Sequence, residues 1–199
     1  MTTTRQLSVG LAVAGWLVLS GWAVVDAQDA LDPLTARLET LPRSAHNSTI
    51  RIDRVAGTNV VRVWIDANED DMRLYSPAGA QLDADVQVSA LVRPGEPMGP
   101  VSLRFESHGP VEPGPGSRAL VLRADSGPLP ARQHEAPPAR SGELLFLLTE
   151  AELSFADFLR LVTSTNAEGR VWDVPFVLLA PQLDLLRAWA HRVLETAGR

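Results

Sequence analysis

The densest group of potential metal ligands in this chain is the acidic segment Asp66–Asp71. Asp66, Asn68 and Asp70 stand at alternate positions, as the first oxygen ligands of a calcium-binding loop do. The sixth position of such a loop needs glycine for its sharp turn and the twelfth a bidentate glutamate, but Asp71 and Pro77 stand there. We therefore expect a solvated hairpin tip, with Asp66, Asn68 and Asp70 kept as candidates for weak divalent-cation binding.

The chain has four histidines, His46, His108, His134 and His191. No two of them stand at the spacing of zinc ligands. His108 and His134 fall in two predicted loops and form a zinc site only if those loops meet and Glu112 or Glu135 adds a third ligand. His191 lies on the predicted last helix, where we expect it to be exposed or at a packing seam.

The residue types in this sequence offer little support for nucleophilic catalysis. The chain has no cysteine, which excludes disulfides, thiol nucleophiles and zinc–thiolate sites. It also has no lysine, so lysine Schiff-base chemistry and a Walker-type phosphate loop are excluded. Asp125-Ser126-Gly127 lacks the flanking glycine and strand-to-helix context of a nucleophile elbow. We predict no catalytic residue and no cofactor; a hydrolase whose Ser, His and Asp come from distant loops remains an alternative.

The charge balance bears on partners. The 199 residues carry a formal charge of −6, and all 18 cationic side chains are arginine. An acidic chain without a basic run is a poor partner for nucleic acid, so we expect no nucleic-acid partner.

Residues 1–27 have the three-part order of a secretory signal. Arg5 marks a short positive start, Leu7–Val25 is uncharged, and Val25 and Ala27 place small residues before a cleavage site. The alternative is an uncleaved membrane anchor, because the uncharged run approaches the ~20 residues that span a bilayer. Both readings place the remainder outside the cytoplasm, in the periplasm or extracellular space; a membrane association is expected only if the segment persists.

The remainder divides into an N-terminal helical arm, 28–48, and one β-rich domain, 49–199. In the arm, Asp32 and Pro33 open a helix whose leucines recur at helical spacing until Pro42. In the domain, runs of apolar residues, mostly alternating with polar ones, predict strands at 49–55, 60–66, 72–75, 86–92, 101–106 and 119–122. The strand at 72–75 is predicted to return in a hairpin with 60–66. Proline-rich segments 107–118 and 128–141 are predicted to be long surface loops.

The last quarter shows four further signals. Leu144–Leu148 is a continuous apolar run that predicts a central strand covered on both faces. Ser154 and Asp157 form a capping pair at the start of a helix. A hairpin is predicted around Asp173–Pro175, and a last helix runs from Pro181 to a stop at Gly198. Trp172 and Trp189 are expected in the core or at a seam.

Together these elements predict an α+β, mainly β fold: an antiparallel β-sandwich or partly open barrel with a helix–hairpin–helix C-terminal section. The strand Val101–Ser107, the run Leu144–Leu148, the serine-capped helix and the segment Ala167–Ala190 resemble a group of uncharacterised small exported bacterial β-rich proteins, over about residues 85–195. The resemblance implies the fold and an exported location, and it carries over no catalytic residue.

The sequence thus favours a non-enzymatic binding or accessory protein of the cell envelope, whose partner is another envelope protein. Abundant sheet edge is a common means of capturing such a partner. A small-ligand binder, a divalent-cation binder, and a hydrolase with a loop-built site are the alternatives.

Overall fold

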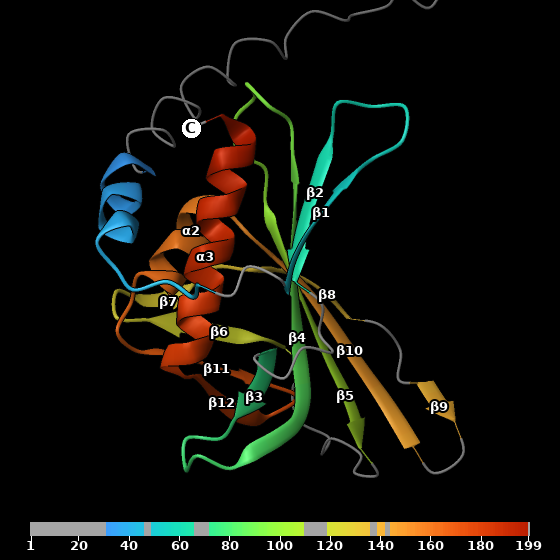
Figure 1. Ribbon diagram of the computed structural model, residues 1–199. Helices are drawn as coiled ribbons and strands as arrows, with labels where there is room; N and C mark the ends of the chain where they lie inside the picture. Colours follow the sequence, from blue (N-terminus) through green and yellow to red (C-terminus); the bar gives the residue numbers. More distant parts are fainter. Residues whose placement is uncertain are drawn as a thin grey trace, which may run out of the picture.

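The computed structural model describes residues 31–45, 49–65, 72–109, 119–135, 139–141 and 144–198, with the backbone alone at 108, 109, 135, 139–141 and 144–146. The described residues are mainly β, with one antiparallel sheet and three helices (Figure 1). The strands are β1 (Ile50–Arg54), β2 (Val61–Ile65), β3 (Arg73–Tyr75), β4 (Gln81–Val92), β5 (Val101–Gly109), β6 (Val121–Ala124), β7 (Gly127–Leu129), β8 (Arg132–Glu135), β9 (Ala139–Ser141), β10 (Leu144–Leu153), β11 (Ala167–Val171) and β12 (Val174–Leu178). The helices are residues 31–39, α2 (Phe155–Val162) and α3 (Ala180–Ala197).

The sheet order is β7-β6-β11-β12-β3-β4-β5-β10-β8. Two long strands each pair with two shorter ones along the same edge: β4 with β3 and β2, and β10 with β9 and β8. The sheet curls into a half-barrel, with α2 and α3 on its concave side and the helix 31–39 outside them (Figure 1). Of the two architectures expected, the partly open barrel is therefore the nearer, since the described strands form one sheet.

Side chains bridge the curl of the sheet. On β8, the side-chain oxygen of Gln133 accepts a hydrogen bond from the Leu120 N–H at 2.8 Å. The side-chain nitrogen of Gln133 donates to the Leu120 carbonyl. Leu120 immediately precedes β6, near the opposite end of the sheet order. A glutamine side chain thus takes the place of a strand partner between the two ends.

Strand alternation decides which face is buried, as the sequence predicts. On β4, Val86 and Val88 are buried, whereas Gln87 and Ser89 on the other face are partly exposed. The concave face meets α2 and α3 in one hydrophobic core. At the centre of this core, the ring centres of Trp189 and Phe158 lie 5.0 Å apart in an edge-to-face arrangement. Trp172 and Trp189 are both buried, so their predicted place in the core is confirmed.

The β11–β12 turn differs from the prediction. Val171 pairs with Val174, which leaves Trp172 and Asp173 as the turn, not Asp173–Pro175. Both turn residues have positive φ, 52° and 63°, in a region that bulky side chains rarely adopt. Trp172 is held there by burial and by its indole N–H, which donates to the Thr149 hydroxyl on β10 at 2.9 Å. Pro175 is tolerated in β12 because β3 pairs with that strand only at Val177.

Two further predictions are wrong. The strand at 72–75 does not return on 60–66; β3 pairs with β4 and β12, because β4 is long enough to hold β3 and β2 end to end. Segment 128–141 is not one long loop, since it contributes to β7 and contains β8 and β9. Pro128 is tolerated in β7 because, among the described strands, β7 pairs with β6 alone. A proline on such an edge strand can face the side where no neighbouring strand needs its missing N–H. The other predicted loop, 107–118, begins later than expected, because β5 continues to Gly109.

Several predictions concern residues outside the described part of the chain. These are the signal sequence 1–27, the ends of the arm at 28–30 and 46–48, the acidic segment 66–71 and the loop residues 110–118. Among the described helices, none combines the length and apolar character needed to cross a membrane.

Gly169 is the residue on which the β11–β12 pair depends most closely. It lies opposite Phe176, whose ring covers it, and a Cβ there would meet that ring and lie 2.7 Å from the Val121 carbonyl oxygen. We expect Gly169→Ala to lower the free energy of unfolding by about 2 kcal/mol or more through overpacking. Gly99→Ala is the control, since its Cβ would meet only the Leu91 carbonyl at 3.6 Å. Urea unfolding of both variants measures the difference, and equal stability would contradict this account.

Candidate functional site

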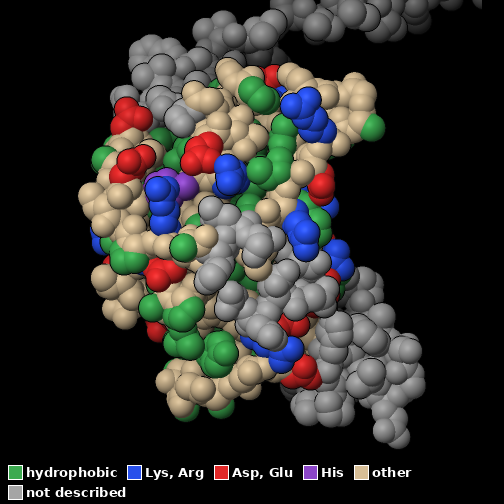
Figure 2. Space-filling model, viewed as in Figure 1, with side chains coloured by type: hydrophobic (Ala, Val, Ile, Leu, Met, Phe, Trp, Pro, Cys, Tyr) green, Lys and Arg blue, Asp and Glu red, His purple; other side chains and the backbone are tan. Residues whose placement is uncertain are grey.

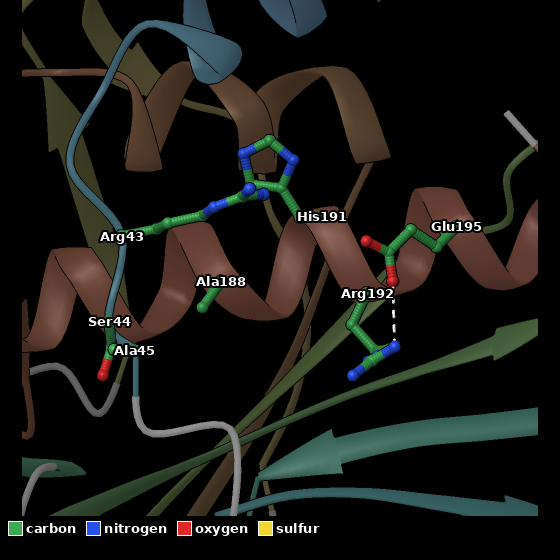
Figure 3. Close-up of a pocket in the computed structure, with 7 residues that line it drawn as sticks. All are labelled: Arg43, Ser44, Ala45, Ala188, His191, Arg192 and Glu195. Carbon is green, nitrogen blue, oxygen red and sulfur yellow. Dashed lines mark hydrogen bonds and ion pairs between the residues drawn. The ribbon is translucent and has the colours of Figure 1, made fainter.

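A cavity of about 320 Å³ opens between the N-terminal arm and α3 (Figure 3). We call it the arm pocket. It is lined by Arg43, Ser44, Ala45, Ala188, His191, Arg192 and Glu195. The first three come from the segment after the helix 31–39, and the other four from the last three turns of α3.

Backbone contacts fix the arm on α3. The Ser44 N–H donates to the Asp184 carbonyl at 3.0 Å, and the Arg187 guanidinium reaches the Pro42 carbonyl at 3.5 Å. Leu38 of the preceding helix is fully buried in the core. Arg43 is therefore held between two anchored points and faces the side of α3 that carries His191.

Arg187 is the anchor of this region. Its side chain is buried, and its Nε donates to the carbonyl of Val162 at 2.8 Å. One terminal nitrogen donates to the Ser164 carbonyl at 3.3 Å, and the other to the Asp184 carboxylate at 2.7 Å. These carbonyls lie at the C-terminal end of α2, where backbone acceptors lack helical partners. One guanidinium thus joins the end of α2, the middle of α3 and the arm.

The arm pocket is rich in hydrogen-bond donors. Arg43 and Arg192 contribute two guanidinium groups, against the single carboxylate of Glu195, which pairs with Arg192 at 2.9 Å. Within the described residues Arg43 has no ion-pair partner. In Figure 2 basic side chains lie beside a histidine on the face that carries α3. The pocket is thus locally positive in a chain of net charge −6.

His191 joins this set with an altered proton affinity. Partial burial lowers its pKa below the usual 6.5, and the nearby Arg43 guanidinium lowers it further. Glu39, the Leu38 carbonyl and Glu195 act in the opposite direction and do not reverse the shift. The imidazole is therefore neutral at pH 7. Its predicted place at a packing seam is confirmed, because the ring sits between α3 and the arm (Figure 3).

The arrangement suits binding better than acyl transfer. The pocket includes a serine, a histidine and a glutamate, but Figure 3 shows the Ser44 hydroxyl pointing away from the His191 ring. A nucleophile and its base need to be within hydrogen-bond reach. Guanidinium groups, in contrast, bind carboxylate and phosphate oxygens with two parallel hydrogen bonds.

The other histidines are not brought together by the fold as the sequence suggested. His108 lies on β5 and His134 on β8, so neither is in a loop. They pair with Phe146 and Glu150 of β10, four positions apart along that strand. Within the described residues no group of metal-ligating side chains could hold an ion. The candidates Asp66, Asn68 and Asp70 lie outside those residues.

Asp125-Ser126-Gly127 has a structural role in the β6–β7 turn. The Asp125 carboxylate accepts from the Thr165 N–H at 2.6 Å and the Asn166 N–H at 2.9 Å. The Thr165 bond is the main reason that the pKa of Asp125 lies below its usual 3.8. Ser126 accepts two hydrogen bonds from Arg160 of α2. Both side chains therefore fasten the turn to the end of α2 and the segment that follows it.

A second cavity lies under the concave face of the sheet. Its lining is entirely apolar and includes Phe105, Phe176 and Leu186, and its volume is about 20 Å³. That is near the space of one water molecule, and an apolar lining offers water no partners. This cavity is a packing gap rather than a ligand site.

No pattern in the sequence points directly to Arg43, Arg187 or Arg192. One signal was available for Arg187: it stands four residues after Leu183 and three before Ala190, on the apolar stripe of α3. An arginine on a buried stripe needs acceptors. Arg43 and Arg192 are far apart in sequence, and only the fold brings them together.

Comparison with protein-family models, with curated proteins and with solved structures finds no match for this chain. The resemblance to small exported bacterial proteins therefore stays a prediction.

The anchoring role of Arg187 can be measured. We expect Arg187→Met to lower the free energy of unfolding by about 3 kcal/mol, because it leaves the Val162 and Ser164 carbonyls without their donor. Arg192→Met on the same helix removes only a surface ion pair and should change stability by less than about 1 kcal/mol. Chemical unfolding gives both values. Hydrogen exchange over residues 31–45 should also become faster in Arg187→Met alone; unchanged exchange there would contradict the anchoring role.

Proposed function

We propose that this chain is an exported, non-enzymatic binding protein of the cell envelope whose arm pocket holds an anionic group of its ligand. The observation that supports this most is that Arg43, His191 and Arg192, from two separate segments, line one open cavity. Arg43 extends toward His191 and Arg192 pairs with Glu195 (Figure 3), so the lining offers two guanidinium groups in a chain whose overall charge is negative.

The size of the pocket is consistent with this function. A volume of about 320 Å³ lies at the lower end of the range of small-molecule sites, roughly 300–1,000 Å³. The ligand class is defined by its chemistry: a carboxylate or a phosphate, which a guanidinium binds through paired oxygens. Such a group occurs on a free metabolite or on an acidic side chain of an envelope partner, and the experiment below separates these sources.

Binding should depend on pH through His191. The pKa of His191 is below 6.5 in the free pocket, so the ring is neutral above that pH. A bound anion favours the protonated ring and raises its pKa, so binding takes up a proton. Affinity should therefore increase as the pH falls through the pKa of the ring in the complex, and level off once the free ring is also protonated.

The test is isothermal titration with sulfate and with oxalate at pH 7.5 and pH 5.5, because the charges of these phosphate-like and carboxylate anions hardly change between the two pH values. We expect tighter binding at pH 5.5, and about tenfold weaker binding for Arg43→Ala or Arg192→Ala, the loss of one charge-assisted interaction. Glu195→Gln should bind more tightly, since it removes a competing carboxylate from Arg192. His191→Gln should bind with the same affinity at both pH values.

Arg123→Ala is the matched control, because Arg123 carries the same charge on β6 and does not line the pocket. Titrations that show no heat with either anion, or equal weakening by Arg123→Ala, would refute an anion site.

The source of the anion is then found by crosslinking in cells and mass spectrometry of what is recovered. An acidic peptide crosslinked to residues 43–45 identifies a protein partner, and a chain recovered alone favours a free small molecule.

Export has a separate test. We expect the C-terminally tagged chain, recovered from cells, to begin at Gln28, because the small residues Val25 and Ala27 precede that bond. Intact-mass spectrometry measures the N-terminus directly. A chain that keeps residues 1–27 and sediments with membranes would replace this proposal with the membrane-anchored alternative.

A further inference from the structure

β1 is an edge strand with hydrogen-bonding groups directed outward. In the described part of the chain it pairs with β2 alone. The Val55 N–H donates to the Val60 carbonyl at 2.9 Å, and antiparallel pairing alternates from there. Ile50, Ile52 and Arg54 therefore direct their N–H and C=O groups away from β2.

This edge is open compared with that of β7. Charges, prolines and short length are the usual means of protecting an edge strand. β7 has three residues, one of them Pro128, whereas β1 has five residues and no proline; its protection rests on three charged side chains, of both signs. Ile52 at the middle of β1 is 47% exposed. Figure 1 shows the tip of the β1–β2 hairpin projecting away from the helices.

The sequence of β1, Ile-Arg-Ile-Asp-Arg, is complementary to itself in the antiparallel direction. When two copies pair about Ile52, each Arg51 lies opposite Asp53 of the second copy. Ile52 then lies opposite Ile52, and Ile50 opposite Arg54, so the outward backbone groups of the two strands meet. The alternation of the outward hydrogen-bonding groups and the opposite charges of Arg51 and Asp53 therefore both favour this register.

Charge also disfavours the neighbouring registers that keep the backbone groups matched. A shift in one direction places Arg51 opposite Arg51, and a shift in the other places Asp53 opposite Asp53. Like charges directly opposite each other destabilise a strand pair. The register about Ile52 is thus selected over both.

Asp53 is held in place by a neighbour on β2. Its Oδ2 accepts from the Trp64 indole N–H at 2.6 Å, and the Arg62 guanidinium lies 5.0 Å from the Trp64 ring centre. The indole fixes the carboxylate on the convex face of the sheet, where the side chain of Arg51 also lies. Holding one partner in place lowers the entropic cost of an ion pair.

We propose that two copies of this chain pair through β1 about a twofold axis at Ile52, which joins their sheets into one. The occupant of the edge is a second copy because the Arg51–Asp53 complementarity is between β1 and itself. The proposal does not depend on the arm pocket, whose residues lie on the arm and on α3.

The test is sedimentation of the purified protein, expressed from its full-length sequence, at chain concentrations up to about 300 μM, which covers weak, small interfaces. We expect a concentration-dependent dimer. Arg51→Asp should weaken dimerisation at least tenfold, because it places carboxylates opposite each other. Adding Asp53→Arg restores opposite charges between the copies and should restore the dimer; Arg62→Asp is added with it, because Arg62 lies opposite residue 53 on β2 and like charges there would destabilise the hairpin. Circular dichroism confirms that each variant is folded.

Introduced cysteines provide a second readout in a chain that has none. Under mild oxidation Ile52→Cys should form a covalent dimer, since the two thiols meet at the axis. Leu91→Cys is the control: Leu91 is more exposed, at 59%, but lies on β4, which has neighbours on both sides. A monomer throughout the concentration range, or equal crosslinking at both positions, would overturn the proposal.

Discussion

The Arg187 guanidinium is the interaction on which the helical side of this molecule depends. A buried cation is costly unless its donors are matched, and here a carboxylate and backbone carbonyls from α2, its following segment and the arm match them. The same contacts hold the C-terminal end of α2 against α3 and fix where the arm crosses α3. The arm pocket exists because that crossing is fixed, so the candidate site follows from a structural requirement of the core.

The curled sheet imposes a second constraint, because its concave side must be filled. α2 and α3 supply most of the filling, and Trp172 supplies part of it from the β11–β12 turn. Positive φ angles at two non-glycine residues are unfavourable by themselves. Burial of the indole and its bond to Thr149 offset this, so the turn follows the core rather than local preference.

The sequence predicted features that depend on neighbouring residues. The alternation of β4 and β5, the Ser154 cap with its bond from Asp157, and the Gly198 stop of α3 are all local patterns, and the structure has them. Which strands pair with each other was harder to predict, because nothing near residues 72–75 shows that β4 is long enough to hold two partner strands on one edge. The site was not predictable for the same reason. Arg43 and Arg192 line one pocket only because the fold holds the arm against α3, partly through Arg187, whose burial no short pattern reveals.

The position of β11 and β12 in the sheet has a consequence for how the chain assembles. They lie between β6 and β3, so strands made early become neighbours only through strands made last. Until about residue 178 is synthesised, β3 has only β4 as a partner and β6 only β7, and α3 is absent from the concave side. Folds of such high contact order form slowly, because distant segments must meet first. The two halves of the sheet can therefore join only after nearly the whole chain has been made, so the complete sheet forms late in synthesis.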